Sequence, residues 1–211
     1  MIGIVDYGMG NIQSVRNAFV RLGSSVRIVT SGREIAECRG LVLPGVGAFH
    51  MAMQNLSQMG LIPSIQQVVA QGTPLLGICL GLQLLAESSE EHGQHEGLGL
   101  IPGRVRRIPV SPGHRLPHIG WNTVSLRPRT DDVLFAGIKN ESAYYFVHSF
   151  MLDCEARYVT AVTDHGGPVT AAVQSGSIFA VQFHPEKSQT NGLRLLKNFV
   201  RQVAVTAEEH A

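Results

Sequence analysis

The sequence predicts an α/β protein with an open, mainly parallel central sheet, helices on both faces, and a smaller region of mixed or antiparallel strands. Three observations support this fold class. In the first half of the chain, short apolar runs alternate with amphipathic stretches, which is typical of a parallel sheet covered by helices. Glycine-containing turns follow several of these runs. Beyond about residue 97, the pattern changes to shorter strands with hairpin-like spacings.

The apolar runs of the first half are expected to be buried strands, and the amphipathic stretches are expected to be helices. The helix after the first run shows the pattern: Ile12, Val15 and Phe19 recur at helical spacing, and Gly23 follows as a C-terminal cap. The expected strands are 2–6, 26–29, 40–43 and 73–78, and the expected helices are 12–22, 51–59, 65–70 and 80–87.

The second half is expected to add short strands and a closing helix. The expected strands are 99–107, 121–126, 144–150, 158–163, 169–174 and 178–183, and the helix is 191–203. No linker or internal repeat separates the halves, so residues 1–211 are interpreted as one domain. Open α/β sheets bind ligands at the carboxyl ends of their strands, and the glycine-rich turns of the first half lie at such ends.

Composition and charge exclude several classes of function. Only 16% of residues are charged and the net charge is +1, so we expect no nucleic-acid partner. No apolar run reaches the roughly 18 residues of a membrane span, and the first residues lack a basic signal-peptide region. Cys38, Cys79 and Cys154 are widely separated and form no CxxC pair, which predicts neither disulfides nor a zinc site. We expect a cytoplasmic protein with no cofactor and no metal.

Cys79 lies in Gly77-Ile78-Cys79-Leu80-Gly81, at an expected strand-to-helix junction. This pattern is typical of a nucleophile elbow, in which glycines allow a tight turn that exposes the nucleophile above the sheet. The N-terminus of the following helix points its free N–H groups to the same place, and the backbone N–H of Leu80 can then face an oxyanion. Alternatively, Cys79 is a small hydrophobic residue packed between strand and helix.

His184 and Glu186 follow another expected strand. They can supply the general base and the orienting carboxylate that a cysteine nucleophile requires. His184 would reach the same edge of the sheet as Cys79 and act as general base and acid. Glu186 would accept the second imidazole N–H and hold the ring in one tautomer. Each residue alone is compatible with an ordinary surface position, but the three together at strand ends predict a catalytic triad.

Two further turns contain paired glycines. Pro44-Gly45-Val46-Gly47 follows the third expected strand, and its backbone N–H groups can point toward a bound oxyanion. Gly8-Met9-Gly10 resembles the start of a dinucleotide fingerprint, but Gln13 stands where the third glycine is required. Pro44–Gly47 is therefore the better candidate for a turn that binds an oxyanion, although most Pro-Gly pairs form ordinary turns without a binding role.

These motifs resemble the class I (triad) glutamine amidotransferases. Within that family, the chain is similar to a subgroup that works with a separate cyclase chain. The resemblance extends over nearly the whole chain in family order. Its motifs are Gly77–Gln83, His184–Ser188, Asp6–Asn11, Pro44–Phe49, where many relatives have Gly-Gly instead of Gly-Val-Gly, His118–Asn122 and Tyr145–Phe150.

The resemblance implies hydrolysis of glutamine to glutamate and ammonia through a glutamyl thioester on Cys79. It implies that the N–H of Leu80 and an N–H of the 45–47 turn, that of Val46 or Gly47, hold the oxyanion. It also implies a set of residues that bind the substrate: Gly45, Gln83, Glu91, His148, Ser149 and Phe150.

A partner is implied as well. The subgroup passes its ammonia to a (β/α)₈-barrel cyclase, which closes an imidazole ring on a phosphorylated ribulosyl substrate, and the two chains form a heterodimer. The candidate contact residues beside the motif turns are Asn11, Trp121, Tyr145 and Lys187.

Three other functions remain open at this stage. The chain could be a class I amidotransferase that serves another synthase, or a cysteine hydrolase acting on esters or peptides on a similar sheet. It could also be a flavodoxin-like binding module in which Cys79 is a packing residue. A glutamine-mimicking diazo-ketone that alkylates the thiol would separate the last two from an amidotransferase.

Overall fold

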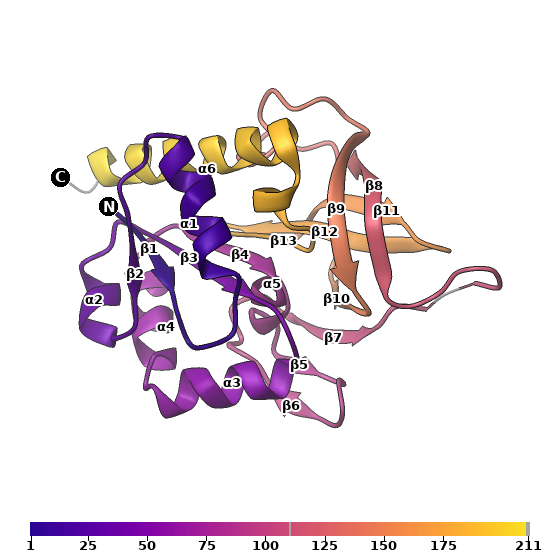
Figure 1. The fold of residues 1–211 in the computed structure, drawn as a ribbon, viewed down its shortest axis with the longest axis horizontal. Helices are drawn as coiled ribbons and strands as arrows, with labels where there is room; N and C mark the ends of the chain where they lie inside the picture. Colours follow the sequence, from indigo (N-terminus) through magenta and orange to yellow (C-terminus); the bar gives the residue numbers. More distant parts are fainter. Residues whose placement is uncertain (110, 210–211) are drawn as a thin grey trace.

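A computed structural model describes residues 1–109 and 111–209 (Figure 1). A nine-stranded sheet crosses the described part of the molecule, in the order β2-β1-β3-β4-β13-β12-β11-β8-β9. Its first five strands are parallel: β2 (Val26–Val29), β1 (Ile2–Val5), β3 (Gly40–Gly45), β4 (Leu75–Cys79) and β13 (Ile178–Val181). The next four are antiparallel: β12 (Pro168–Ser175), β11 (Val159–Asp164), β8 (His118–Leu126) and β9 (Ser142–His148).

A second sheet of four strands lies beside the first, in the order β10-β7-β5-β6. Its members are β10 (Phe150–Cys154), β7 (Gly103–Arg107), β5 (Ser88–Ser89) and β6 (His95–Glu96). The predicted fold class is confirmed. The antiparallel strands, however, fall into two groups, one of which continues the central sheet.

Helices cover both faces of the parallel strands (Figure 1). On one face are α1 (Ile12–Arg21) and α6 (Gln189–Glu209); on the other are α2 (Gly32–Ala36), α3 (Phe49–Gln58), α4 (Ile62–Ala70) and α5 (Leu80–Leu84). Strand β3 shows how the layers form: Leu41 and Leu43 enter the hydrophobic cluster beneath α3 and α4, and Val42 enters the cluster beneath α1 and α6. This alternation follows from the two-residue period of a strand.

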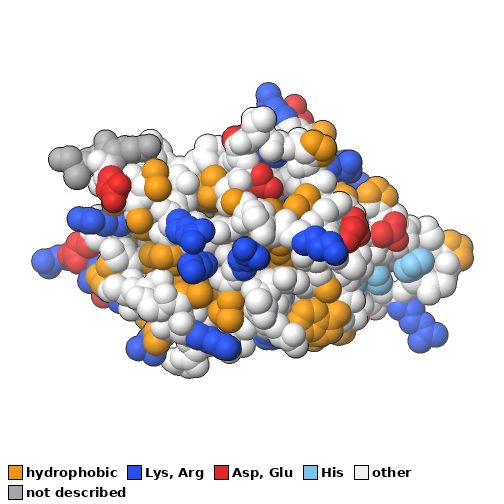
Figure 2. Space-filling model, turned by 90° about the horizontal axis from the view of Figure 1, so that it is seen from above, with side chains coloured by type: hydrophobic (Ala, Val, Ile, Leu, Met, Phe, Trp, Pro, Cys, Tyr) orange, Lys and Arg blue, Asp and Glu red, His pale blue; other side chains and the backbone are white. Residues whose placement is uncertain are grey.

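Helix α6 continues through Glu209, six residues beyond the expected end at 203. Its buried positions include Leu195, Leu196 and Phe199, whereas Arg194 and Lys197 are exposed. Figure 2 shows the molecule from above, where basic and acidic side chains are interspersed with hydrophobic and other uncharged surface. Among the described helices, none is both long and apolar enough to cross a membrane.

Three predicted elements have different bounds in the structure. The helix expected over 80–87 stops at Leu84, since the carbonyls of Leu84 and Leu85 accept bonds from Leu98 and Ile101 instead. The strand expected over 144–150 is divided between β9 and β10, which belong to different sheets. The strand expected over 99–107 begins only at residue 103.

Helix α2 was not predicted from the sequence. It has five residues and begins with a capping box, in which the side chains of Ser31 and Glu34 each accept a hydrogen bond from the other's backbone N–H. So short a helix shows too little apolar periodicity to be recognised, although the Ser-x-x-Glu pattern is visible in the sequence.

Candidate active site

Cys79 is the last residue of β4 and immediately precedes α5. Its φ is 55° and its ψ is −108°, so a non-glycine residue adopts a left-handed conformation at this turn. The neighbouring glycines are required for steric reasons. A Cβ on Gly77 would lie 2.9 Å from the Gly81 carbonyl oxygen, and a Cβ on Gly81 would collide with the Leu43 carbonyl oxygen. The geometry is that of the predicted nucleophile elbow.

His184 and Glu186 follow β13, the strand that pairs with β4. Because neighbouring parallel strands end at the same edge, the imidazole and the thiol are brought to one place. Glu186 Oε1 lies 2.8 Å from His184 Nδ1, and the two side chains are 1% and 2% exposed. His184 Nε2 is buried and has no hydrogen-bond partner among the described residues, so it is available to a group in the cavity.

The electrostatic surroundings keep His184 protonated. Burial lowers the pKa of His184, but hydrogen bonding and electrostatic interaction with Cys79 and Glu186 outweigh this effect and raise the pKa to about 10. The imidazolium carries a proton on each ring nitrogen. The proton on Nδ1 is held by Glu186, and the proton on Nε2 is free for transfer.

A cavity of about 530 Å³ opens above these groups. Cys79 and His184 line it, and Glu186 stands behind the imidazole. Most of the residues implied to bind substrate or oxyanion also line it: Val46, Gly47, Leu80, Gln83, Glu91, His148, Ser149 and Phe150. The carboxyl ends of β3, β4 and β13 therefore meet as expected from the sequence, and the end of β9 joins them.

Gly45 is the exception among these residues, because it does not line the cavity. It pairs with Cys79 in the sheet register. A Cβ on Gly45 would collide with the Tyr7 hydroxyl and lie 2.9 Å from Leu80 Cβ. Gly45 therefore allows β3 and the elbow to approach closely, and its neighbour Val46 is 40% exposed at the cavity.

Glu91 reaches the cavity from the loop between β5 and β6. Its Oε2 accepts a hydrogen bond of 2.6 Å from the backbone N–H of Phe49, the first residue of α3. This bond ties the loop to the turn containing Val46 and Gly47. Glu91 therefore positions that turn as well as lining the cavity.

Gln182 is a residue that the sequence reasoning did not select. It is completely buried, and its Nε2 lies 3.8 Å from Cys79 Sγ. Its Oε1 accepts a hydrogen bond of 3.2 Å from Gln83 Nε2. The available signal was a single amide within an otherwise apolar strand, two residues before His184.

Three of the four candidate partner-contact residues lie together beside the cavity. Trp121 is 50% exposed, faces Tyr145 across β8 and β9, and makes an edge contact with its ring at 6.2 Å. Lys187 Nζ lies 5.8 Å from the same tyrosine ring. Asn11 precedes α1, which contacts the short 3₁₀ helix Pro185–Lys187.

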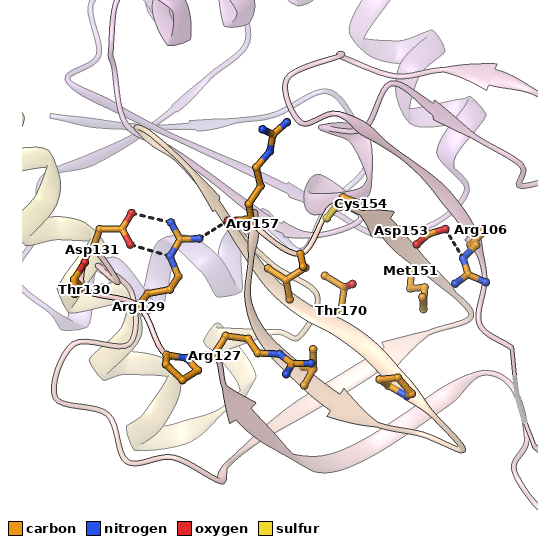
Figure 3. A pocket seen from close by; sticks show the side chains of 15 residues that line it. Arg106, Arg127, Arg129, Thr130, Asp131, Met151, Asp153, Cys154, Arg157 and Thr170 are labelled. Atoms are coloured by element: carbon orange, nitrogen blue, oxygen red, sulfur yellow. Dashed lines mark hydrogen bonds and ion pairs between the residues drawn. The ribbon is translucent and has the colours of Figure 1, made fainter.

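A larger cavity of about 1160 Å³ lies between β10 and the β11–β12 hairpin (Figure 3). Ion pairs hold its rim: Arg106 with Asp153 at 2.9 Å, and Arg129 with Asp131 at 2.7 Å. The thiol that lines this cavity belongs to Cys154, and burial raises the pKa of that thiol to about 11. None of Cys79, His184 and Glu186 lines it. The smaller cavity is therefore the candidate active site.

Comparisons with known proteins agree with this geometry. The family model for class-I glutamine amidotransferases matches residues 3–203. The imidazole glycerol phosphate synthase subunit HisH of Moorella thermoacetica is 50% identical over 94% of this chain and 93% of its own length. The subunit HisH 1 of Campylobacter jejuni is 44% identical over 95% of this chain and 100% of its own length.

Solved structures show the same fold at lower identity. A glutamine amidotransferase superimposes with a TM-score of 0.75 at 19% identity, covering 96% of this chain and 98% of that one. The glutaminase domain of Trypanosoma brucei CTPS with bound acivicin superimposes with a TM-score of 0.64 at 18% identity, covering 95% and 93%.

Proposed function

Since the chain belongs to the class I glutamine amidotransferase family, we propose that Cys79, His184 and Glu186 form its catalytic triad. The chain acts as the glutaminase subunit of an imidazole glycerol phosphate synthase and provides ammonia for histidine biosynthesis. One observation carries the residue assignment. The strained Cys79 and the His184–Glu186 pair lie at the ends of adjacent parallel strands, and Cys79 and His184 line one cavity.

The triad performs the hydrolysis in two steps. Cys79 Sγ attacks the side-chain amide carbon of glutamine, and His184 donates its Nε2 proton to the departing nitrogen, so that ammonia leaves and a glutamyl thioester remains. Neutral His184 then takes a proton from water, and the resulting hydroxide attacks the thioester to give glutamate and the free thiolate. Glu186 stabilises the imidazolium at the start and end of this cycle.

Backbone N–H groups hold the oxyanion in both steps. Leu80 begins α5, and its N–H has no preceding turn to bond within the helix. Val46 or Gly47 supplies the second donor from the turn after β3, where Gly47 has a φ of 104°. Loss of one such donor typically costs about 100- to 1000-fold in kcat.

Polar groups along the cavity hold the rest of the glutamine molecule. Gln83, Glu91 and the segment 148–150 line it together with Cys79 and His184, and they provide partners for the α-amino and α-carboxylate groups. Gly45 contributes indirectly, by allowing Tyr7 and Leu80 to approach.

The chain is one subunit of a two-component synthase and uses glutamine as its substrate. For the second component, we propose a (β/α)₈-barrel cyclase that forms a heterodimer by packing against Asn11, Trp121, Tyr145 and Lys187. Ile119 and Trp121 support this surface, because they are exposed two positions apart on one strand, and a contiguous exposed apolar patch often marks a protein–protein contact. A closed passage keeps ammonia unprotonated and nucleophilic.

We further propose that residues 1–211 form a single domain that works in the cytoplasm. The central sheet supports the first point, since strands from both halves of the chain pair within it. The free thiols support the second, because reduced cysteines are typical of a reducing compartment.

The triad is tested with a diazo-ketone analogue of glutamine and intact-mass measurement. Cys79→Ala should lose both labelling and glutamate production, whereas Cys154→Ala, which removes a half-buried thiol outside the cavity, should keep both. Labelling of the Cys79→Ala chain would refute the assignment.

The partner is tested by adding purified cyclase with an analogue of its substrate. The loop that contains Asn11 lies against the oxyanion turn, since a Cβ on Gly47 would be 2.8 Å from Met9 Cε. We therefore expect kcat for glutamine to rise by orders of magnitude. An unchanged rate would exclude coupling, and rescue by a different synthase would favour another amidotransferase.

A further inference from the structure

We propose that His118 and Asn122 are positioning residues, which hold the cavity wall at 147–150 through a hydrogen-bonded chain with only one permitted arrangement of protons. The inference rests on the proposed function, because it concerns the wall of the same cavity. Neither residue lines the cavity, so both act through His148.

The chain begins at Asn122 on β8. Asn122 Nδ2 lies 3.1 Å from His118 Nε2 and 2.7 Å from the backbone oxygen of Asp164, and Asn122 Oδ1 accepts the N–H of Thr123 at 2.8 Å. Both amide hydrogens and the amide oxygen are therefore used. A reversed amide would direct its oxygen at the Asp164 carbonyl, so Asn122 must donate to His118 Nε2.

The two histidines continue the chain to the cavity wall. Since His118 Nε2 accepts, neutral His118 carries its proton on Nδ1, which lies 3.1 Å from His148 Nε2. His148 Nε2 then accepts, and His148 carries its proton on Nδ1, which donates to the Phe150 carbonyl at 2.8 Å. Each imidazole is thereby held in one tautomer by its two neighbours.

The Phe150 carbonyl joins this chain to the nucleophile. It also accepts a hydrogen bond of 3.0 Å from Gln83 Nε2, whose other hydrogen points to Gln182 Oε1 at 3.2 Å. Gln182 Nε2 in turn lies 3.8 Å from Cys79 Sγ. The wall segment is thus fixed from β8 on one side and from the elbow on the other.

The surroundings of the histidine pair favour the neutral forms that the chain requires. His118 stacks between Phe146 and His165, at 4.7 and 4.2 Å, and the titratable groups that face the pair are His165 and His184. Burial lowers the pKa of His118 to about 4 and that of His148 to about 3. At neutral pH, each ring therefore carries a single proton.

The sharpest test is Asn122→Asp, which keeps the shape of the side chain but replaces the donor with an acceptor. At pH 8, His118 cannot satisfy both neighbours with one proton. We therefore expect KM for glutamine to rise about tenfold relative to wild type, with kcat within about threefold. As the pH falls to 6, the new carboxylate favours a doubly protonated His118 that donates from both nitrogens, and the KM ratio should return toward 1.

Thr123→Val is the matched control, since it changes an exposed side chain on the same strand and keeps the backbone. Its KM ratio should stay near 1 at every pH. A structural defect in Asn122→Asp would raise KM without recovery at low pH. A pH-independent ratio in that variant, or a ratio of 1 throughout, would overturn the proposal.

Two measurements keep the proposal testable if Asn122→Asp fails to fold. His118→Phe keeps the ring stacking but removes the donor to His148, so its KM ratio should be raised at both pH 8 and pH 6. Nitrogen-15 chemical shifts of the wild-type rings at pH 7.5 should show the Nδ1–H tautomer for His118 and His148, and the Nε2–H tautomer at either ring would overturn the proposal. Wild-type turnover of glutamine tests the proposed function separately.

Discussion

Acidification should destabilise the folded chain through the buried pair His118 and His148. Both have pKa values lowered by burial, to about 4 and about 3, whereas an unfolded histidine titrates near 6.5. Below pH 6.5 the unfolded chain therefore binds protons that the folded chain does not, and the free energy of unfolding falls with pH. The loss begins near pH 6.5 and is complete for His118 below pH 4.

The size of the effect follows from these pKa values. At pH 5, each histidine costs about 2 kcal/mol of stability relative to neutral pH. Urea unfolding at pH 7.5 and pH 5.0 measures the change in free energy of unfolding. His184 responds with the opposite sign, because its pKa is raised and its contribution grows as the pH falls from 7.5 toward 6.5. A variant is therefore needed to isolate the pair.

His118→Phe supplies that comparison, because it removes one titrating ring from the pair and keeps the stacking. It should lower stability at pH 7.5, yet its further loss on going to pH 5.0 should be about 2 kcal/mol smaller than in wild type. His92→Gln changes an exposed histidine and should leave the wild-type pH dependence intact. An equal pH dependence in His118→Phe and wild type would refute the reasoning.

Three further substitutions test the geometry of the site. Glu186→Gln keeps an acceptor for His184 but removes a buried charge, so kcat for glutamine should fall roughly 10- to 100-fold; an unchanged kcat would contradict the role of the carboxylate. Gly45→Ala should lower both the thermal midpoint and kcat, because the added methyl group collides with the Tyr7 hydroxyl; adding Tyr7→Phe should recover part of the loss, and no recovery would argue against that collision. Gln182→Leu leaves a buried amide hydrogen of Gln83 unpaired, so the free energy of unfolding measured in urea should fall by about 1–3 kcal/mol. An unchanged free energy of unfolding would contradict this role of Gln182.

Much of the proposed active site could be predicted from the sequence, because part of its geometry is local. The turn at Cys79 is flanked by Gly77 and Gly81, and this spacing of two positions on either side is visible in the sequence. The hydrogen bond between His184 Nδ1 and Glu186 Oε1 joins residues that are only two positions apart in the sequence. Such short-range constraints are visible in the sequence without knowledge of the tertiary structure.

The positioning residues could not be predicted in this way. His118 and His148 meet because β8 pairs with β9 in one register, and a shift of one residue would place their side chains on opposite faces of the sheet. Gln182 reaches Cys79 across 103 positions of sequence. For each of these residues, an ordinary buried or exposed polar side chain was an equally good interpretation of the sequence alone.

By itself, the sequence determined the alternation of strands and helices, the conformation of the elbow, and the pairing of imidazole with carboxylate. Only the tertiary structure decided that β13 lies beside β4, that α5 ends at Leu84, and that two histidines share one proton arrangement next to the cavity. The reason is physical. Local steric and hydrogen-bonding preferences act over a few residues, whereas strand order, register and burial result from contacts between distant segments.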